Sequence, residues 1–224
     1  MTNPKVLFFD VGNTLLFPDR ARILAPLHAR KIDPTMDQWH AVERRTKSEF
    51  DAAMSHGKSD HGFWHIFYTH LLDEFQLHDD GVRDELVAAT RVSANWGEIR
   101  PGTRDVLQRL GQRYRLAVIS NADGKIAALL QKNKLADCFQ TITDSGLVGY
   151  EKPHLAIFQA ALQSMNTAAE KTLYVGDVYS VDYAGATAAG MQAVLFDVCG
   201  AYRESGKPRV ESLEELEMKI ESVL

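Results

Sequence analysis

The chain has 224 residues, of which 45% are hydrophobic and 25% are charged, and its formal net charge is −5 at pH 7. These values are ordinary for a globular protein that buries a substantial core, either as one large domain or as a domain with an insert. The negative charge excludes a general electrostatic attraction to nucleic acid or to an anionic membrane surface.

Two further features of the composition narrow the class of protein. Cys138 and Cys199 are the only cysteines, too few for a disulfide framework, so a reducing compartment is favoured. The apolar run at residues 6–9 is too short for a signal peptide, and no apolar run approaches the ~20 residues needed to span a bilayer. We therefore expect a cytoplasmic protein with no membrane or nucleic-acid partner.

The first predicted element is a buried strand at residues 6–9, which are all apolar. Asp10 stands at its end, and a Gly-Asn pair at residues 12–13 then turns the chain. Taken alone, Asp10 is typical of a turn residue that follows a strand.

From about residue 17 to residue 96, helical periodicity replaces the strand pattern. Polar or glycine-containing segments, such as residues 55–60, separate the periodic stretches. The mixed charged run at residues 43–47 is typical of an exposed helix face. Apolar spacing predicts four helices, around residues 23–32, 39–50, 63–75 and 82–92. We expect an all-α helical bundle inserted directly after the first strand.

The remainder of the chain alternates strands with helices. Short apolar strands are predicted at residues 116–120, 139–143, 173–177 and 193–197. Such strands, alternating with helices, indicate a parallel sheet that is covered on both faces. We predict the α/β class: a doubly wound, Rossmann-like parallel sheet of five main strands. Residues 1–16 and 97–224 would form this core domain, and residues 17–96 an inserted α-helical cap domain.

Reactive side chains follow several of these strands. In an open α/β sheet, ligands bind outside the carboxyl ends of the strands. A single site at that edge would explain why one cation, several carboxylates and a hydroxyl all fall there. The residues are Asp10, Ser120-Asn121, Gly176-Asp177 and Asp197, with Lys152-Pro153 just ahead of a predicted helix.

Four segments, in chain order, resemble the four motifs of the haloacid dehalogenase superfamily, whose members are mostly phosphate-ester hydrolases. Gly176-Asp177 with Asp182 matches the fourth motif in its G-D-x-x-x-x-D form. The resemblance covers essentially the whole chain, because the helical insert matches the family's four-helix C1-type cap in position and length. The first three motifs are residues 10–14, Ser120-Asn121 and Lys152-Pro153.

The resemblance implies a covalent mechanism. Asp10 would attack phosphorus and form an aspartyl-phosphate, which splits one hard displacement into two easier ones. Lys152 would neutralise charge beside this nucleophile. Ser120 and the Asn121 amide would hold phosphoryl oxygens, and Thr14 would support the Asp10 loop. The implied substrate is a small phosphorylated metabolite.

The resemblance also implies Mg²⁺ as the cofactor, because a dianionic phosphate repels a carboxylate nucleophile. The ion would be held by Asp10, Asp177 and the backbone carbonyl of Gly12. Asp182 belongs to the same acidic group, and we expect it to orient a metal-bound water or Lys152 rather than to bind the ion directly.

One residue departs from the family pattern. Most phosphatases of the family carry a second Asp two residues after the nucleophile, which protonates the leaving group and later activates water. Gly12 stands there instead. Its carbonyl preserves the metal geometry, but the general acid–base group is missing, and such a group is typically worth ~10²–10⁴-fold in rate.

Three explanations for Gly12 stay open. The substrate has a good leaving group, such as an acyl phosphate, or a histidine of the cap replaces the missing Asp, or the chemistry is different. The histidines that gather around one loop and helix are His56, His61, His65 and His70. The loop at residues 56–62 is expected to face the active site, so His56, Lys58 and His61 are candidate substrate-binding residues.

Alternative functions also remain. The dehalogenase branch of the family uses no metal, and the fourth motif with Gly176-Asp177 and Asp182 argues against it. The phosphonatase branch keeps Mg²⁺ but needs a cap lysine for a Schiff base, for which Lys31, Lys47 and Lys58 are available. A non-enzymatic module that binds phosphate and metal is a further alternative. The sequence leaves open whether the protein is a monomer or a homodimer.

Overall fold

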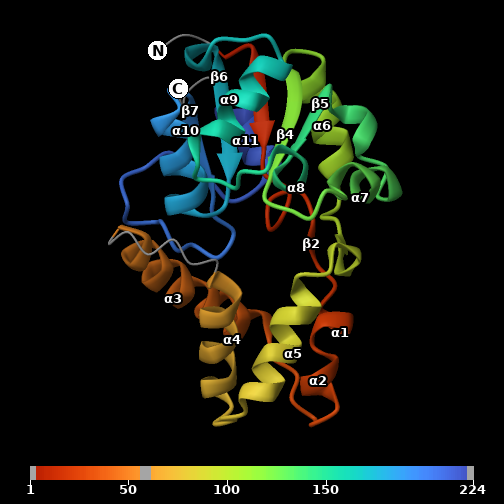
Figure 1. The fold of residues 1–224 in the computed structure, drawn as a ribbon, viewed down its shortest axis with the longest axis vertical. Coiled ribbons are helices and arrows are strands. Elements are labelled where there is room, and N and C mark those ends of the chain that lie inside the picture. Colours follow the sequence, from red (N-terminus) through yellow and green to blue (C-terminus); the bar gives the residue numbers. More distant parts are fainter. Residues whose placement is uncertain (1–3, 56–61, 221–224) are drawn as a thin grey trace.

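A parallel sheet of six strands forms the centre of the computed structural model, which describes residues 4–55 and 62–220 (Figure 1). The strand order is β5-β4-β1-β6-β7-β8. The predicted α/β fold with a parallel sheet is confirmed, and the two-residue edge strand β8 is an addition to the five strands predicted. The strands are β1 (Val6–Phe9), β4 (Arg115–Ser120), β5 (Thr141–Asp144), β6 (Thr172–Gly176), β7 (Gln192–Phe196) and β8 (Arg209–Val210).

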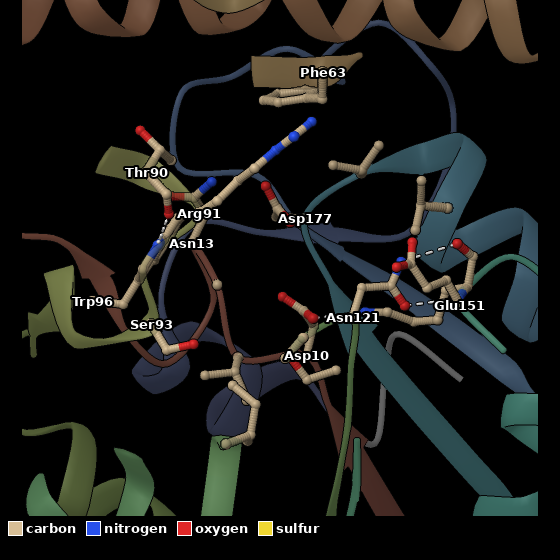
Figure 2. A pocket seen from close by; sticks show the side chains of 18 of the residues that line it. Asp10, Asn13, Phe63, Thr90, Arg91, Ser93, Trp96, Asn121, Glu151 and Asp177 are labelled. Carbon is tan, nitrogen blue, oxygen red and sulfur yellow. Dashed lines mark hydrogen bonds and ion pairs between the residues drawn. The ribbon is translucent and has the colours of Figure 1, made fainter. Parts of the chain in front are cut away.

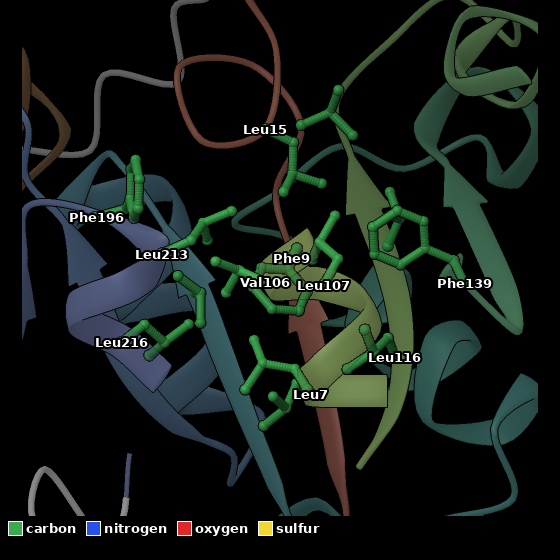
Figure 3. Close-up of a cluster of buried hydrophobic side chains, with 14 of the residues drawn as sticks. Leu7, Phe9, Leu15, Val106, Leu107, Leu116, Phe139, Phe196, Leu213 and Leu216 are labelled. Carbon is green, nitrogen blue, oxygen red and sulfur yellow. The ribbon is translucent and has the colours of Figure 1, made fainter. Parts of the chain in front are cut away.

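Strand β1 is buried on both faces, which explains its wholly apolar sequence. It pairs in parallel with β4 on one side and with β6 on the other. Successive side chains of a strand point to opposite faces. Leu7 and Phe9 accordingly enter one hydrophobic cluster (Figure 3), whereas Val6 and Phe8 enter the other. The polar residue that follows this strand is thereby held at the centre of the sheet's carboxyl edge.

Helices cover both faces of the sheet. On the face of Leu7 and Phe9 lie α6 (Thr103–Gly111), α7 (Ile126–Lys132) and α11 (Leu213–Lys219). On the opposite face lie α9 (Leu155–Ser164) and α10 (Ala184–Ala188). The short helix α8 (Ser145–Val148) follows β5, and 3₁₀ turns occur at η1 (Ser93–Asn95), η2 (Ala136–Cys138) and η3 (Ala169–Lys171).

The helical insert, which we call the cap, lies beyond the carboxyl edge of the sheet (Figure 1). Its helices pack around a third hydrophobic cluster that includes Trp39, Phe67 and Leu86. The single helix predicted across residues 23–32 is wrong, because the chain forms two short helices there and Pro26 lies in the first turn of the second. The cap helices are α1 (Arg20–Ile23), α2 (Ala25–His28), α3 (Met36–Ser55), α4 (Phe63–Glu74) and α5 (Asp80–Thr90).

Two short strands join the cap to the core. β2 (Phe17–Pro18) and β3 (Trp96–Glu98) pair antiparallel. They lie at the two ends of residues 17–96, where the sequence placed the boundaries between cap domain and core domain. That division into domains stays a prediction. Within the part of the chain that the structure describes, none of the helices combines the length and the apolar character of a membrane span.

Candidate active site

A cavity of 590 Å³ lies at the carboxyl edge of the sheet, on the side that faces the cap (Figure 2). Asp10 directly follows β1, Ser120 is the last residue of β4, and Asp177 directly follows β6. Lys152 lies shortly before α9, and all four residues line the cavity and are buried. The topology therefore brings together these four of the residues that the sequence placed at the sheet edge, whereas Asp197 does not line the cavity.

Lys152 is the centre of a buried polar cluster. Its Nζ donates hydrogen bonds to Asp10 Oδ1 at 2.6 Å, to Asp182 Oδ1 at 2.7 Å and to the Tyr174 hydroxyl at 2.8 Å. Burial acts to lower the pKa of Lys152, but Asp10 and Asp182 outweigh it and hold that pKa above its usual value. The ammonium group is therefore a fixed positive charge against Asp10.

Asp182 is the second carboxylate that holds Lys152 in place. Besides Lys152, its Oδ1 accepts from the Tyr174 hydroxyl at 2.9 Å, and its Oδ2 accepts from the Val178 N–H at 3.0 Å. Asp182 lies so close to Gly176 that a Cβ on Gly176 would stand 2.5 Å from Asp182 Cγ. This close approach explains why glycine precedes Asp177 in the motif.

The Asn121 side chain takes part in the positioning of Lys152. It accepts from the Lys152 N–H at 2.7 Å and donates to the Lys152 carbonyl at 3.0 Å. Its side-chain amide is therefore engaged with protein backbone rather than turned to a phosphate. Thr14 is buried but does not line the cavity, and its Oγ1 has no hydrogen-bond partner among the described residues.

Burial dominates the electrostatics of the two main carboxylates. Burial raises the pKa of Asp10 to about 7, against the opposing effect of Lys152. Burial also raises the pKa of Asp177 to about 6, although Lys47 opposes it. Protein cations thus compensate the negative charge of the site only in part.

Lys47, which the sequence offered only as a candidate Schiff-base lysine, contacts Asp177 beside the cavity. Residues 43–47 were expected to form an exposed helix face, which is wrong for Glu43 and Lys47, because they are 7% and 1% exposed, whereas the two arginines between them are exposed as expected. From α3 of the cap, Lys47 Nζ lies 2.8 Å from Glu43 Oε1 and 3.1 Å from Asp177 Oδ2. A cap lysine therefore contacts a candidate metal ligand of the core.

Gly12 faces an indole ring. A Cβ added to Gly12 would stand 3.4 Å from Cζ3 of Trp96, which is ordinary van der Waals contact. The Trp96 Nε1–H donates to the Thr90 carbonyl at 2.7 Å and so fixes the ring. The space beside Gly12, where the second Asp of the family would project, is therefore bounded by an aromatic ring that has no acidic proton to donate.

The cap contributes an aromatic and basic wall to the cavity. Phe63 and Trp64 line it from α4, and Arg91, the C-cap residue that follows α5, lines it from the adjoining turn. Figure 2 shows Arg91 extending toward Phe63, on the opposite side of the cavity from Asp10. Among the described residues, Arg91 is the one cationic side chain of the cavity lining besides Lys152.

The cap residues predicted to bind substrate cannot be placed. His56, Lys58 and His61 lie outside the described residues. His65 and His70 are not part of the cavity lining, and His70 Nε2 contacts Glu49 Oε2 at 2.8 Å. Neither of these two histidines is in position to replace the missing acid.

Asp197, which also follows a strand, has a structural role instead. It is fully buried, accepts from the N–H groups of Ala201 and Tyr202 at 2.8 and 2.9 Å, and accepts from Arg209 Nε at 2.9 Å. It fixes the loop after β7 and does not line the cavity.

The donor set fits Mg²⁺ better than a metal that needs several protein ligands. In the described ranges, no three His, Cys, Asp or Glu side chains are grouped to hold one ion. Asp177 Oδ2 is buried and lacks a well-aligned hydrogen bond within those ranges, although Lys47 Nζ is 3.1 Å away. Two carboxylates with carbonyl and water oxygens are the coordination that Mg²⁺ accepts. With all four carboxyl groups ionised, the buried cluster has two more negative than positive charges, which one divalent cation would balance; its members are Asp10, Glu43, Asp177, Asp182, Lys47 and Lys152.

Comparison with known proteins gives the class to which this fold and site belong. A model of the haloacid dehalogenase-like hydrolases matches residues 4–190. The chain therefore belongs to this family and is an enzyme of it, as the four motifs predicted.

Relatives and solved structures extend over most of the chain. The haloacid dehalogenase-like hydrolase domain-containing protein 3 of Bos taurus is 30% identical over 214 residues, which cover 85% of this chain and 81% of that protein. The glyceraldehyde 3-phosphate phosphatase of Pyrococcus abyssi is 29% identical over 196 residues, with coverages of 86% and 81%. The crystal structure of the HAD-hydrolase YfnB from Bacillus subtilis, bound to magnesium, shares the fold, with a TM-score of 0.68, 22% identity and coverages of 97% and 98%.

Proposed function

We propose that this enzyme is a Mg²⁺-dependent phosphatase that hydrolyses a small phosphorylated metabolite through an aspartyl-phosphate on Asp10. The observation that carries the proposal is the placement of Asp10 at the cavity, with Lys152 Nζ 2.6 Å away and Asp177 lining the same space. Relatives named as phosphatases of glyceraldehyde 3-phosphate and of ribulose-1,5-bisphosphate support the substrate class.

The residues of the chain divide the chemistry between them. Oδ1 of Asp10 is engaged with Lys152, so Oδ2 is the oxygen that would attack phosphorus as the bond to the leaving oxygen breaks. The Ser120 hydroxyl would donate to a phosphoryl oxygen, and the fixed ammonium of Lys152 would stabilise negative charge on the transferring group. Water then hydrolyses the aspartyl-phosphate and regenerates Asp10.

Asp10, Asp177 and the Gly12 carbonyl would hold the Mg²⁺ ion. When bound, the ion neutralises charge between the phosphate and Asp10 and favours the ionised nucleophile. This need is consistent with the raised pKa of about 7 that burial gives Asp10. Asp182, whose two oxygens are engaged with Lys152, Tyr174 and the Val178 N–H, positions Lys152 instead of binding the ion.

The ring of Trp96 beside Gly12 limits the leaving group. Since no carboxyl projects from residue 12, leaving groups that need little protonation are favoured, and acyl phosphates are the clearest example. Arg91 and the rings of Phe63 and Trp64 would bind the rest of the substrate. A guanidinium is suited to a carboxylate or a second phosphate.

A substrate screen tests the proposal. Phosphate release from acetyl phosphate, p-nitrophenyl phosphate and a panel of sugar and acid phosphates is measured with and without Mg²⁺, for wild type and for Asp10→Asn. Mg²⁺-dependent release by wild type alone is expected. If none of these substrates is hydrolysed and both proteins bind a phosphate analogue equally well, the phosphatase proposal is refuted and a binding module is favoured.

The phosphonatase alternative now depends on whether one lysine, Lys47, can form the Schiff base. Among the described residues, Lys47 is the cap lysine that reaches the site, but a Schiff base requires a neutral amine. Burial acts to lower the pKa of Lys47, yet Asp177 and Glu43 hold it well above the usual value. Phosphatase is therefore the function we propose first, and phosphonoacetaldehyde belongs in the same screen. A cytoplasmic location and a monomeric or homodimeric state stay predictions.

A further inference from the structure

Lys47 of the cap forms an ion pair with a carboxylate of the core. Its side chain is 1% exposed and its Nζ lies between two carboxylates, Glu43 Oε1 at 2.8 Å and Asp177 Oδ2 at 3.1 Å. Glu43 belongs to the same helix, four residues earlier, whereas Asp177 belongs to the core. One ammonium group is thus paired with the cap and with the proposed metal site at the same time.

Further polar contacts to the core come from α3 residues three before and four after Lys47. Arg44 Nη1 donates to the Cys199 carbonyl at 2.9 Å. Asp51 accepts from the Ser180 N–H and from the Tyr202 hydroxyl, each at 2.9 Å. Lys47 therefore lies between two anchoring residues, and its distance from Asp177 depends on how the cap is docked.

We propose that Lys47 competes with the divalent cation for Asp177, so that docking of the cap and loading of the metal site oppose each other. The inference rests on the metal part of the proposed function. In the docked arrangement the ammonium already neutralises Asp177, and a divalent cation on that carboxylate would lie close to a second positive charge. Like charges at such a separation repel strongly inside a protein.

The pairing of Lys47 makes the contact easy to release. When α3 moves away from the core, Glu43 moves with Lys47, so the lysine keeps one of its two carboxylate partners. Separation of Lys47 from Asp177 therefore does not leave a buried ammonium group without a partner, which would cost free energy. An ion pair built wholly within the core would not have this property.

The affinity for Mg²⁺, measured by calorimetry on the whole protein without substrate, tests the proposal. Lys47→Met is expected to bind Mg²⁺ about tenfold or more tightly than wild type, since one repelling charge is removed. Lys47→Arg, which keeps the charge, should remain near wild type. Arg45→Met removes a positive charge from the exposed side of the same helix and controls for a general effect of charge.

A second variant guards against loss of folding. Lys47→Met leaves Glu43 buried and unpaired, so Glu43→Gln/Lys47→Met removes the pair as a unit. It should also bind Mg²⁺ more tightly than wild type, because Glu43 does not contact Asp177 directly and its loss affects the metal site less than the loss of Lys47. The gain should be smaller than for Lys47→Met, since a negative charge near the site is lost as well. Thermal unfolding of each variant identifies those that are folded.

A second readout follows cap docking. By small-angle scattering, Mg²⁺ should expand wild type, as the cap leaves the core, and should change Lys47→Met less. Mg²⁺ binding by the folded Lys47→Met variants that is equal to or weaker than that of wild type would overturn the competition. If neither wild type nor any variant binds Mg²⁺, the metal part of the proposed function fails as well. Neither readout depends on activity toward a substrate, so failure of the competition between Lys47 and Mg²⁺ can be distinguished from failure of the proposed function.

Discussion

The absence of a carboxyl at residue 12 leads to a direct gain-of-function prediction. Gly12→Asp places a carboxyl two residues after the proposed nucleophile. Backbone conformation allows the change, since Gly12 is not among the residues with positive φ. The nearest atoms to an added Cβ are those of Trp96, at 3.4 and 3.7 Å, so the first carbon of the new side chain fits.

The size of the effect follows from what a general acid supplies. Such a group is typically worth ~10²–10⁴-fold, or roughly 3–5 kcal/mol of barrier. Beyond Cβ, however, the new carboxyl must share space with the indole of Trp96. That ring is held in place by its hydrogen bond to the Thr90 carbonyl at 2.7 Å. We therefore expect the lower end of that range, about 10²-fold in kcat/KM, for an alkyl phosphate whose leaving group needs a proton.

The assay compares leaving groups. kcat/KM is measured for glycerol phosphate, as the poor leaving group, and for acetyl phosphate and p-nitrophenyl phosphate, as the good ones. Gly12→Asp should accelerate the first far more than the other two. Gly12→Asn, which has nearly the same shape without an acidic proton, is the matched control and should give no such difference.

Two results would refute this reasoning. An equal gain for good and poor leaving groups would mean that proton transfer never limited the reaction. An equal gain from Asn and Asp would mean that the side chain acts through packing against Trp96. Thermal unfolding of both variants checks that the new side chain has not displaced the ring.

Two further predictions concern stability and substrate choice. Burial raises the pKa of Asp10 from 3.8 to about 7, so Asp10 favours the folded state below pH 4 and loses this contribution as the pH rises through 7. Asp10→Asn should flatten that decline by up to about 4 kcal/mol of unfolding free energy, measured by denaturant titration at several pH values without metal; an unchanged pH dependence would contradict the raised pKa. Arg91→Gln should lower kcat/KM by about tenfold for phosphates with a second anionic group and leave p-nitrophenyl phosphate nearly unchanged. A uniform loss on both kinds of substrate would argue that Arg91 contacts the transferred phosphate or acts structurally.

Residues at strand ends were the predictable part of the site. Asp10, Ser120 and Asp177 each lie at the end of a short apolar strand, and a parallel sheet puts all such ends on one edge. The apolar sequence of residues 6–9 also predicted a strand buried on both faces. Local patterns were sufficient here because the position of each residue is set by the element that it ends.

Contacts that depend on how the cap docks could not be predicted. Lys47 and Glu43 belong to a run of mixed charge that is typical of a solvated helix face, and only the packing of α3 on the core buries them. Trp96 lies next to Gly12 because two distant segments meet at the join between cap and core. Tyr174 was hidden within an apolar strand, although a buried tyrosine hydroxyl normally requires a partner and could have been noticed for that reason.

The covalent intermediate on Asp10 is the central claim. The most direct measurement is rapid quenching of the enzyme in turnover with acetyl phosphate and Mg²⁺, followed by mass spectrometry of the peptide that contains residues 4–16. The account predicts a peptide heavier by one phosphoryl group, in wild type and not in Asp10→Asn. Turnover by wild type without this adduct, or turnover retained in Asp10→Asn, would contradict it.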